Sequence, residues 1–297
     1  TDYAQKRMEK LGEDQVITVE QLAIDVALAG AWVERAAARN SLDAGVSSHR
    51  ASDSVFRKMD GQMQAMRVPG YLNDSGDANT WAAIMTPYVF HDISESGNVD
   101  AIGLYQDQGI HLNWEVAMIG NFRLVSSAFA KTFFGAGADN AQPVATTLNG
   151  AVGRLDKTVT TTADESSDAA YGLFLNIGTE ETSTTFYADN EQVKLNSAAT
   201  TTLTIIGSGE NEGLRFAHAS GTAINNNDSV YTIVFGGPAS LVKVFVPSVG
   251  EFGEIVGPKE SGILDQFASV GWKFYGNYGL LTENRIVRGE YSTSYED

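Results

Sequence analysis

The chain has 297 residues, of which 43% are hydrophobic, no cysteine and a formal charge of −17 at pH 7. The missing cysteines exclude disulfides and thiolate metal sites, and 20 scattered Lys and Arg residues argue against a dedicated nucleic-acid reader, because phosphate recognition needs clustered cations. No run approaches the roughly 18 apolar residues of a membrane span, and residues 1–7 lack the apolar core of a signal peptide, so we expect a soluble protein made in a cytoplasm.

The first predicted helix begins at Thr18-Val19-Glu20-Gln21. This is a capping-box pattern, in which the Thr hydroxyl and the Gln side chain each satisfy a free backbone N–H. Small and apolar residues at spacings of three and four predict that the helix continues to about Asn40, with one face formed by Leu22, Val26, Ala29, Val33 and Ala36.

A second helix is predicted from Ser52 or Asp53 to Val68-Pro69-Gly70, because the residue before a proline is pushed out of the helical region. Its methionine-rich stripe suits a pliable partner surface as well as a core. We favour the core for Val55, Phe56, Met59, Met63 and Met66.

The middle of the chain reads as short strands with one short helix. Trp81–Met85 is predicted to be a strand, and Thr86-Pro87 to start a short helix with a capping hydroxyl. The apolar runs on either side of Gly120-Asn121 predict a bent or bulged strand, or a hairpin. Residues 135–138 are glycine-rich but lack the Lys-Ser/Thr of a phosphate loop, so they indicate a flexible junction.

Composition changes between residues 141 and 227, where Thr and Ser become abundant and helix signals disappear. Alternating runs such as Thr201–Ile206 predict strands. We therefore expect a small all-β module at 141–228, inserted into a core formed by residues 1–140 and 229–297.

The apolar runs Val230–Gly237 and Leu241–Val246 are typical of buried central strands. The Gly- and charge-rich stretch Gly250–Gly262 predicts a loop. Aromatic and aliphatic runs from Gln266 to Glu290, with Gly276-Asn277-Tyr278-Gly279 between them, predict a terminal β-hairpin.

None of the common catalytic motifs is present in the sequence: there is no Walker loop, no Gly-x-Ser-x-Gly elbow and no His-x-x-x-His pair, and the histidines are far apart at His49, His91, His111 and His218. Paired carboxylates stay open, because Asp and Glu are plentiful and their pairing depends on the fold and not on spacing. Two weaker candidates are considered. Asn73–Asp77 is similar to a calcium loop but lacks its bidentate Glu, and the adjacent His91 and Asp92 point in different directions on a helix. His218 is expected to be a turn or packing residue. We predict a protein that is not an enzyme, with no catalytic, cofactor or metal site.

Three blocks in this sequence resemble tailed-phage major capsid proteins of the N-four-like podovirus type, which have the Hong Kong 97-like fold. The first is Gly271–Tyr275 followed by Leu280–Arg288, similar to the family's closing segment. Ala82–Ile93 is similar to its strand, proline and short helix. Trp114–Val125 is similar to its acidic residue, glycine, arginine and aliphatic pair.

The resemblance implies an α+β capsid fold with spine helices and peripheral and axial sheet regions, residues 52–68 being the candidate for the long spine helix. It implies a subunit that assembles with itself into hexamers and pentamers of an icosahedral shell, built in the host cytoplasm and located in the virion capsid. Packaged double-stranded DNA would be enclosed without sequence-specific binding and without a membrane; scaffolding, portal and decoration proteins are the further partners implied. A β-rich surface, adhesion or decoration protein of a virion is the alternative. The family also carries an N-terminal arm and an extended loop that reaches a neighbouring subunit. Little sequence precedes Thr18. We therefore expect either that another segment supplies this contact or that the chain is a processed or partial form.

Overall fold

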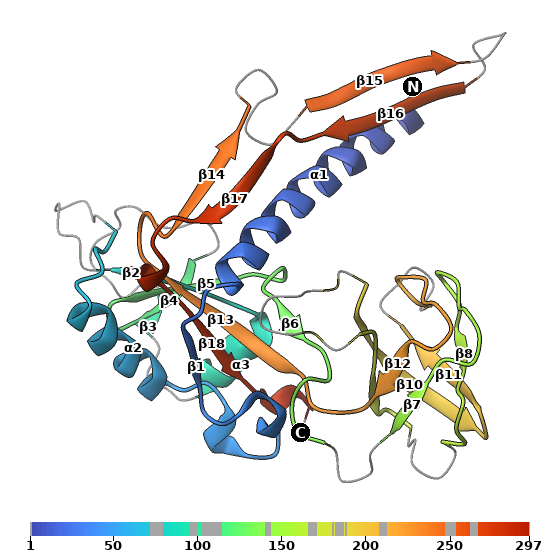
Figure 1. Ribbon diagram of the computed structural model, residues 1–297, viewed down its shortest axis with the longest axis horizontal. Helices are drawn as coiled ribbons and strands as arrows, with labels where there is room; N and C mark the ends of the chain where they lie inside the picture. The colour runs from blue at the N-terminus through green and yellow to red at the C-terminus, as the bar shows by residue number, and fades with distance from the viewer. Residues whose placement is uncertain are drawn as a thin grey trace.

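The computed structural model describes residues 2–71, 80–95, 100–101, 115–139, 144–165, 171–179, 181, 187, 189–207, 213–246, 254–261 and 267–296. The fold is α+β. In the described residues it consists of a main sheet with three helices, a second sheet, and a pair of two-stranded ribbons that project from the main sheet together with the first helix (Figure 1).

The main sheet has eight described strands in the order β1-β18-β13-β2-β5-β4-β3, and β6 also pairs with β13. The pairs β1/β18 and β2/β5 are parallel, and the other pairs are antiparallel. The strands are β1 (Val33–Arg35), β2 (Trp81–Met85), β3 (Asp100–Ala101), β4 (Glu115–Ile119), β5 (Phe122–Ser126), β6 (Thr132–Phe133), β13 (Val230–Gly236) and β18 (Ile286–Tyr291).

Strand β13 lies at the centre of this sheet and is buried on both faces, as its continuous apolar sequence predicts. On one face, the ring of Phe235 makes edge-on contacts with Phe56 and Phe122 at centroid distances of 5.4 and 5.2 Å. On the other face, Val234 packs with Leu28 of the first helix. The main core is therefore two-sided.

Helices α2 (Asp53–Ala65) and α3 (Pro87–Glu95) cover the first of these faces. The predicted stripe of α2 is confirmed, since Phe56, Met59 and Met63 are buried in the core. The predicted strand 81–85 and the short helix after Thr86 are also confirmed, and the Thr86 hydroxyl accepts a hydrogen bond from the Val89 N–H at 3.4 Å.

Helix α1 (Asp2–Leu28) differs from its prediction at both ends. Thr18 does not cap it: the residue lies in the middle of the helix, and its hydroxyl donates to the Asp14 carbonyl at 2.8 Å. The helix ends at Leu28, because Val33–Arg35 pairs in parallel with Arg288–Glu290 and sheet pairing outweighs the helical pattern of the sequence. The predicted face is also wrong, since Leu22 is 43% exposed, while the buried residues are Gln15, Val19, Ala27 and Leu28. At 27 residues α1 is the longest described helix, against 13 for α2, the candidate spine helix.

Thr18→Ala is expected to leave the free energy of unfolding within about 0.5 kcal/mol of wild type, with a stabilising sign, because alanine is the better residue in a helix interior. A true cap would lose about 1 kcal/mol. Urea unfolding followed by far-ultraviolet circular dichroism measures the difference. Thr86→Ala, which removes the hydroxyl that caps α3, is the matched comparison and should show the larger loss; equal losses for the two variants would contradict the mid-helix position of Thr18.

The Thr-rich region forms a second sheet of six described strands in the order β7-β12-β9-β10-β11-β8. Its apolar side chains form a separate core cluster, which includes Leu175, Leu195 and Leu203. The alternating run before Ile206 is confirmed as a strand with alternating burial. These strands pair with one another, and all of them lie within the predicted module, residues 141–228. The exact domain boundaries stay a prediction. The strands are β7 (Ala145–Thr147), β8 (Thr158–Thr160), β9 (Phe174–Ile177), β10 (Glu191–Ala199), β11 (Thr202–Ile206) and β12 (Ala223–Asn225).

The last third of the chain departs most from prediction. Leu241–Phe245 (β14) is not a central strand of the main sheet: it pairs with Gly276–Leu280 (β17) in a separate ribbon. Glu254–Ser261 lies in the stretch predicted as a loop but is strand β15, paired with Phe267–Lys273 (β16). The Gly-Asn-x-Gly segment is therefore inside a strand and makes no hairpin turn, because β16 and β17 each pair with an earlier segment and not with each other.

The predicted hairpin at Gly120-Asn121 is confirmed, whereas the flexibility of residues 135–138 stays a prediction. β4 and β5 form a hairpin through Gly120, whose φ of +56° favours glycine, and the ladder shifts register between Glu115 and Ala117. The glycine-rich residues 135–138 form the irregular connection that leads from the main sheet toward the second sheet. Asn73–Asp77, His111 and Trp114 lie outside the described residues.

Candidate functional site

The two ribbons and α1 form a projecting unit, which we call the arm: α1, β14, β15, β16 and β17. Figure 1 shows α1 lying along the ribbons, with the start of the helix near β15 and β16. The Trp272 indole N–H donates to the Asp14 carboxylate at 3.1 Å, and Ile255 lies beside Gly12. At the base, Leu241 and Leu280 pack with Leu28. One face of the ribbons is thus covered by the helix.

The other ribbon face carries apolar side chains that are exposed at their surface. Because successive side chains of a strand alternate between faces, Val244 points away from the side of Leu241, and Val256 away from the side of Ile255. Val244 is 64% exposed and Val256 is 42% exposed. We call these two residues the outer ribbon face. A two-stranded ribbon alone is marginal in water. Helix α1 covers one face of these ribbons, and the outer ribbon face is available for packing against another surface.

The ribbons also have open edges. Among the described residues, β14 pairs with β17 and β15 with β16, and neither ribbon has a third strand. Unpaired backbone groups at such edges are ready to bond with another chain. Further large apolar side chains stand exposed on the arm, namely Met8, Val16, Leu22, Phe245, Val246, Ile255, Val270, Tyr275 and Leu281. The arm is therefore a surface suited to protein–protein contact.

Beneath the arm, a buried ion network joins β1, β18 and α1. Glu290 is fully buried and accepts from Arg35 Nε at 2.5 Å, from both Nε and Nη2 of Arg39, and forms an ion pair with Arg288. Arg288 also donates through Nη1 to the Leu28 carbonyl at the end of α1. The guanidinium of Arg39 lies 4.2 Å from the ring centroid of Phe133.

The network sets the charge state of its carboxylate. Burial alone would raise the pKa of Glu290, but hydrogen bonds from Arg39 and Arg35 and the charge of Arg288 hold it below its ordinary value. Burial lowers the pKa of Arg288, and Glu290 offsets part of that effect. These groups therefore form a structural clamp at the base of the arm, which ties strand β1 to strand β18.

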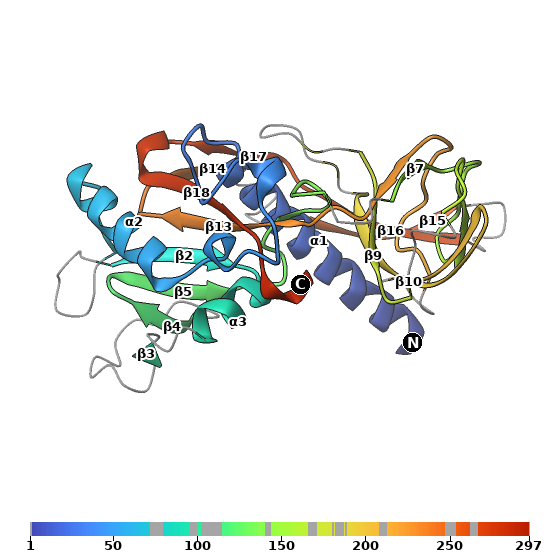
Figure 2. The same cartoon turned by 90° about the horizontal axis from the view of Figure 1, so that it is seen from below.

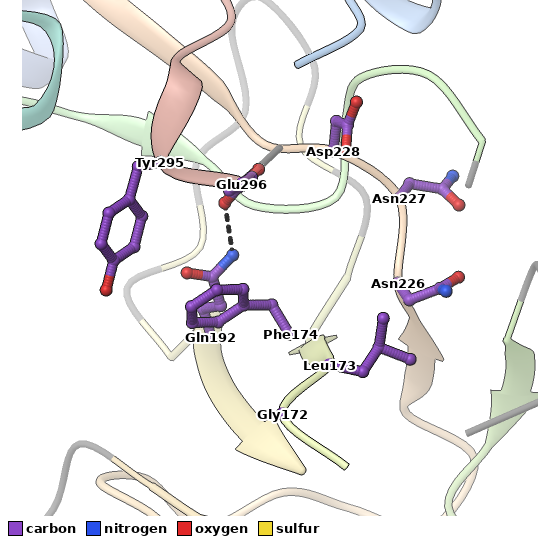
Figure 3. Close-up of a pocket in the computed structure, with 9 residues that line it drawn as sticks. All are labelled: Gly172, Leu173, Phe174, Gln192, Asn226, Asn227, Asp228, Tyr295 and Glu296. Carbon is purple, nitrogen blue, oxygen red and sulfur yellow. Dashed lines mark hydrogen bonds between the residues drawn. The ribbon is translucent and has the colours of Figure 1, made fainter. Parts of the chain in front are cut away.

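A hollow of about 170 Å³ lies where the second sheet meets the main sheet (Figure 3). Its lining residues are Gly172, Leu173, Phe174, Gln192, Asn226, Asn227, Asp228, Tyr295 and Glu296. Gln192 donates to Glu296 at 2.6 Å, and Asn226 accepts from the Val144 N–H at 2.8 Å. Because these polar groups already bond to protein partners, the hollow indicates a joint between two parts of the molecule more than a ligand site.

The histidines that the structure describes are accounted for by structural contacts. His218 is buried, and its Nε2 lies 2.9 Å from Glu191, which also accepts the N–H groups of Arg215 and Phe216. His49 Nδ1 accepts from the Asp43 N–H at 3.1 Å. The expectation that His218 is a packing residue agrees with this position.

His91, Asp92 and Glu95 are the described residues whose ligand atoms come close enough to hold a metal ion. His91 and Glu95 are exposed on α3, whereas Asp92 is buried and accepts hydrogen bonds from the Ser294 N–H and hydroxyl. Since Asp92 is engaged by the C-terminal segment, we assign this group no metal.

The sequence contains a signal for only part of this site. Arg288 and Glu290 stand inside an otherwise apolar strand, a pattern that points to a buried ion pair, but nothing in the sequence identifies Arg35 and Arg39 as their partners. The arm was missed because the apolar run Leu241–Val246 has the same pattern as a central strand. The role of Glu296 has no sequence signal.

No protein-family model matches this chain, and no curated protein matches its sequence. In the described part of the chain no helix combines the length and the apolar character needed to cross a bilayer.

Proposed function

We propose that this protein is a major capsid subunit that assembles with itself into hexamers and pentamers of an icosahedral shell around phage double-stranded DNA. The observation that carries the proposal is the arm: a helix and two ribbons extend from the main sheet and present the outer ribbon face and open strand edges (Figures 1 and 2). The three sequence blocks that resemble the capsid family add to it. The Hong Kong 97-like form of the α+β fold is part of the same proposal.

The geometry of the arm favours head-to-tail contacts. The arm lies on one side of the subunit and carries exposed apolar side chains. It would therefore meet a different surface on its neighbour, and such heterologous contacts close into rings. Each contact is weak, and the closed shell gains stability from the sum of many. The arm also offers the reach to a neighbour that the resemblance leaves without a candidate before Thr18.

The charge balance suits a container. A wall with a formal charge of −17 repels phosphate and encloses DNA without sequence-specific binding. Scaffolding, portal and decoration proteins remain further proposed partners, and the virion capsid, assembled in the host cytoplasm, the proposed location. We propose no catalytic activity.

The second candidate is a surface, adhesion or decoration protein of a virion. The second sheet favours it, because six strands with their own apolar cluster form a unit that could display a binding face. In that case the arm would anchor one copy to a foreign surface and self-assembly would not be required.

Light scattering coupled to size-exclusion chromatography, followed by negative-stain microscopy, separates the two candidates. For a shell protein we expect rings or closed particles of very large mass with five- and six-fold vertices. A protein that stays monomeric or trimeric over a hundredfold range of concentration would contradict the capsid proposal and favour the second candidate.

A further inference from the structure

The last described residues, Ser294–Glu296, lie between α3, the main sheet and the second sheet. Ser294 donates its N–H and hydroxyl to Asp92 of α3. The Tyr295 ring stacks on Tyr88 of α3 at a centroid distance of 4.2 Å and lies 5.6 Å from Phe174 of β9. One short segment therefore contacts helix α3 of the main body and strand β9 of the second sheet.

Glu296 completes the connection. Its Oε1 accepts from Gln192 of β10 at 2.6 Å (Figure 3). The same oxygen accepts from the Tyr231 hydroxyl of β13 at 2.9 Å, and Oε2 accepts from the Ser229 N–H at 2.6 Å. Burial, together with the charge of Glu296, raises the pKa of Tyr231 above its ordinary value, so the phenol stays a donor. Hydrogen bonds to a charged acceptor are stronger than neutral ones.

The two chain connections to the second sheet are held at the main-sheet side. Gly137 donates its N–H to the Asp228 carbonyl at 2.7 Å, and the Asp228 N–H donates to the Ala138 carbonyl at 3.0 Å. The Ala138 N–H in turn donates to the Leu42 carbonyl at 2.9 Å. The two connections thus bond to each other, and we call this pair of chain segments the stalk. Contacts between the two bodies on either side of the stalk then determine how the second sheet is oriented.

Lateral contacts come from two sides of the stalk. On one side Lys131 pairs with Glu181 at 2.7 Å. On the other side stand the Glu296–Gln192 hydrogen bond and the Tyr295–Phe174 contact. Because the second set comes from three consecutive residues that follow β18 and belong to neither sheet, it can be released without breaking either sheet.

We propose that Ser294–Glu296 is a latch that fixes the orientation of the second sheet on the main body, and that release of this segment lets the sheet turn about its stalk. Any partner that captures the segment, or any protease that removes it, would then change where the second sheet points. The latch does not depend on the proposed function, since it concerns a joint within one chain.

The test measures the distance between the two bodies with paired spin labels. The chain has no cysteine, so Arg57→Cys on α2 and Thr160→Cys on β8 give two labels at exposed positions of the main and second sheets. Double electron–electron resonance is recorded in labelled protein diluted with unlabelled protein, so that distances between copies do not contribute. For the wild-type latch we expect one narrow distance distribution.

Glu296→Ala is expected to raise the population of undocked conformers roughly tenfold, visible as a second, broader distance component. Glu95→Gln, which removes an exposed carboxylate from α3 without touching the segment, should leave the distribution narrow. Gln192→Ala breaks the same hydrogen bond from the side of the second sheet and should reproduce the broad component; it replaces Glu296→Ala if that variant does not fold. The latch is overturned by a distribution that stays narrow in the folded variants, that is already broad in the unmodified chain, or that broadens equally in Glu95→Gln.

Discussion

Glu290→Ala is expected to lower the free energy of unfolding by about 3–5 kcal/mol, the range for removing one partner of a buried ion pair. The substitution leaves the guanidiniums of Arg35, Arg39 and Arg288 around a site without their shared acceptor. Of these, Arg288 is the most deeply buried, with 1% of its surface exposed. The loss therefore comes mostly from uncompensated positive charge and less from the missing contacts.

Chemical unfolding in urea, followed by circular dichroism and tryptophan fluorescence, measures this effect. The matched control is Glu254→Ala, which breaks an exposed ion pair with Lys273 on the arm, at 3.1 Å, and should cost no more than about 1 kcal/mol. Equal and small losses in the two variants would show that the network is not a clamp.

The same carboxylate gives the pH dependence a sign. The folded-state pKa of Glu290 lies below its ordinary value of 4.5, so its contribution to stability is present above pH 4.5 and is lost as the pH falls through the folded-state pKa. Below pH 4.5 the free energy of unfolding should therefore fall more steeply for the wild type than for Glu290→Ala. Plotted against pH, the free energies of the two proteins should converge in this acidic range.

The second large effect is expected on assembly. The double variant Val244→Glu with Val256→Glu places two carboxylates on the outer ribbon face and should replace particles by monomers or small rings. A loss that is modest at one contact multiplies over every contact of a closed shell. Neither side chain contributes to the core clusters, so the folded subunit should keep its circular dichroism spectrum and melting temperature.

Sedimentation velocity and negative-stain microscopy give the particle fraction. Tyr171→Glu is the control, because this side chain is 77% exposed next to the second sheet, away from the arm, and its variant should assemble as the wild type does. Particles in normal yield from the double variant would refute the assignment of the outer ribbon face as an assembly contact.

Local sequence signals correctly predicted the helices and strands whose apolar residues are buried in a core. The stripe of α2 and the continuous apolar run of β13 were predicted correctly, because each has one pattern that only a core satisfies. The strand before Ile206 in the Thr-rich region was likewise predicted by alternation. In these segments, local propensity and tertiary packing agree.

The errors occurred where the pattern left the partner open. Leu241–Phe245 is as apolar as a buried strand, yet it pairs with β17 in a ribbon, and only its pairing partner distinguishes the two outcomes. The capping box at Thr18 satisfies the sequence rule, but the helix had already begun at Asp2, so its backbone N–H groups had partners. The candidate site combines residues more than 250 positions apart, such as Arg35 and Glu290, and such a pairing has no local signal.

The position of β18 has a consequence for synthesis on the ribosome. This strand lies inside the main sheet, between β1 and β13, although it is the last of the sheet's strands to be translated. In the nascent chain, the edge of β13 that pairs with β18 therefore stays unpaired until residues 286–291 emerge from the ribosome. All six strands of the second sheet, in contrast, have been translated about 60 residues earlier. Contacts that close over so long a stretch form slowly. We therefore expect the second sheet to fold first, and the main sheet to remain incomplete, with its apolar faces open to chaperones, until residues 286–291 have emerged.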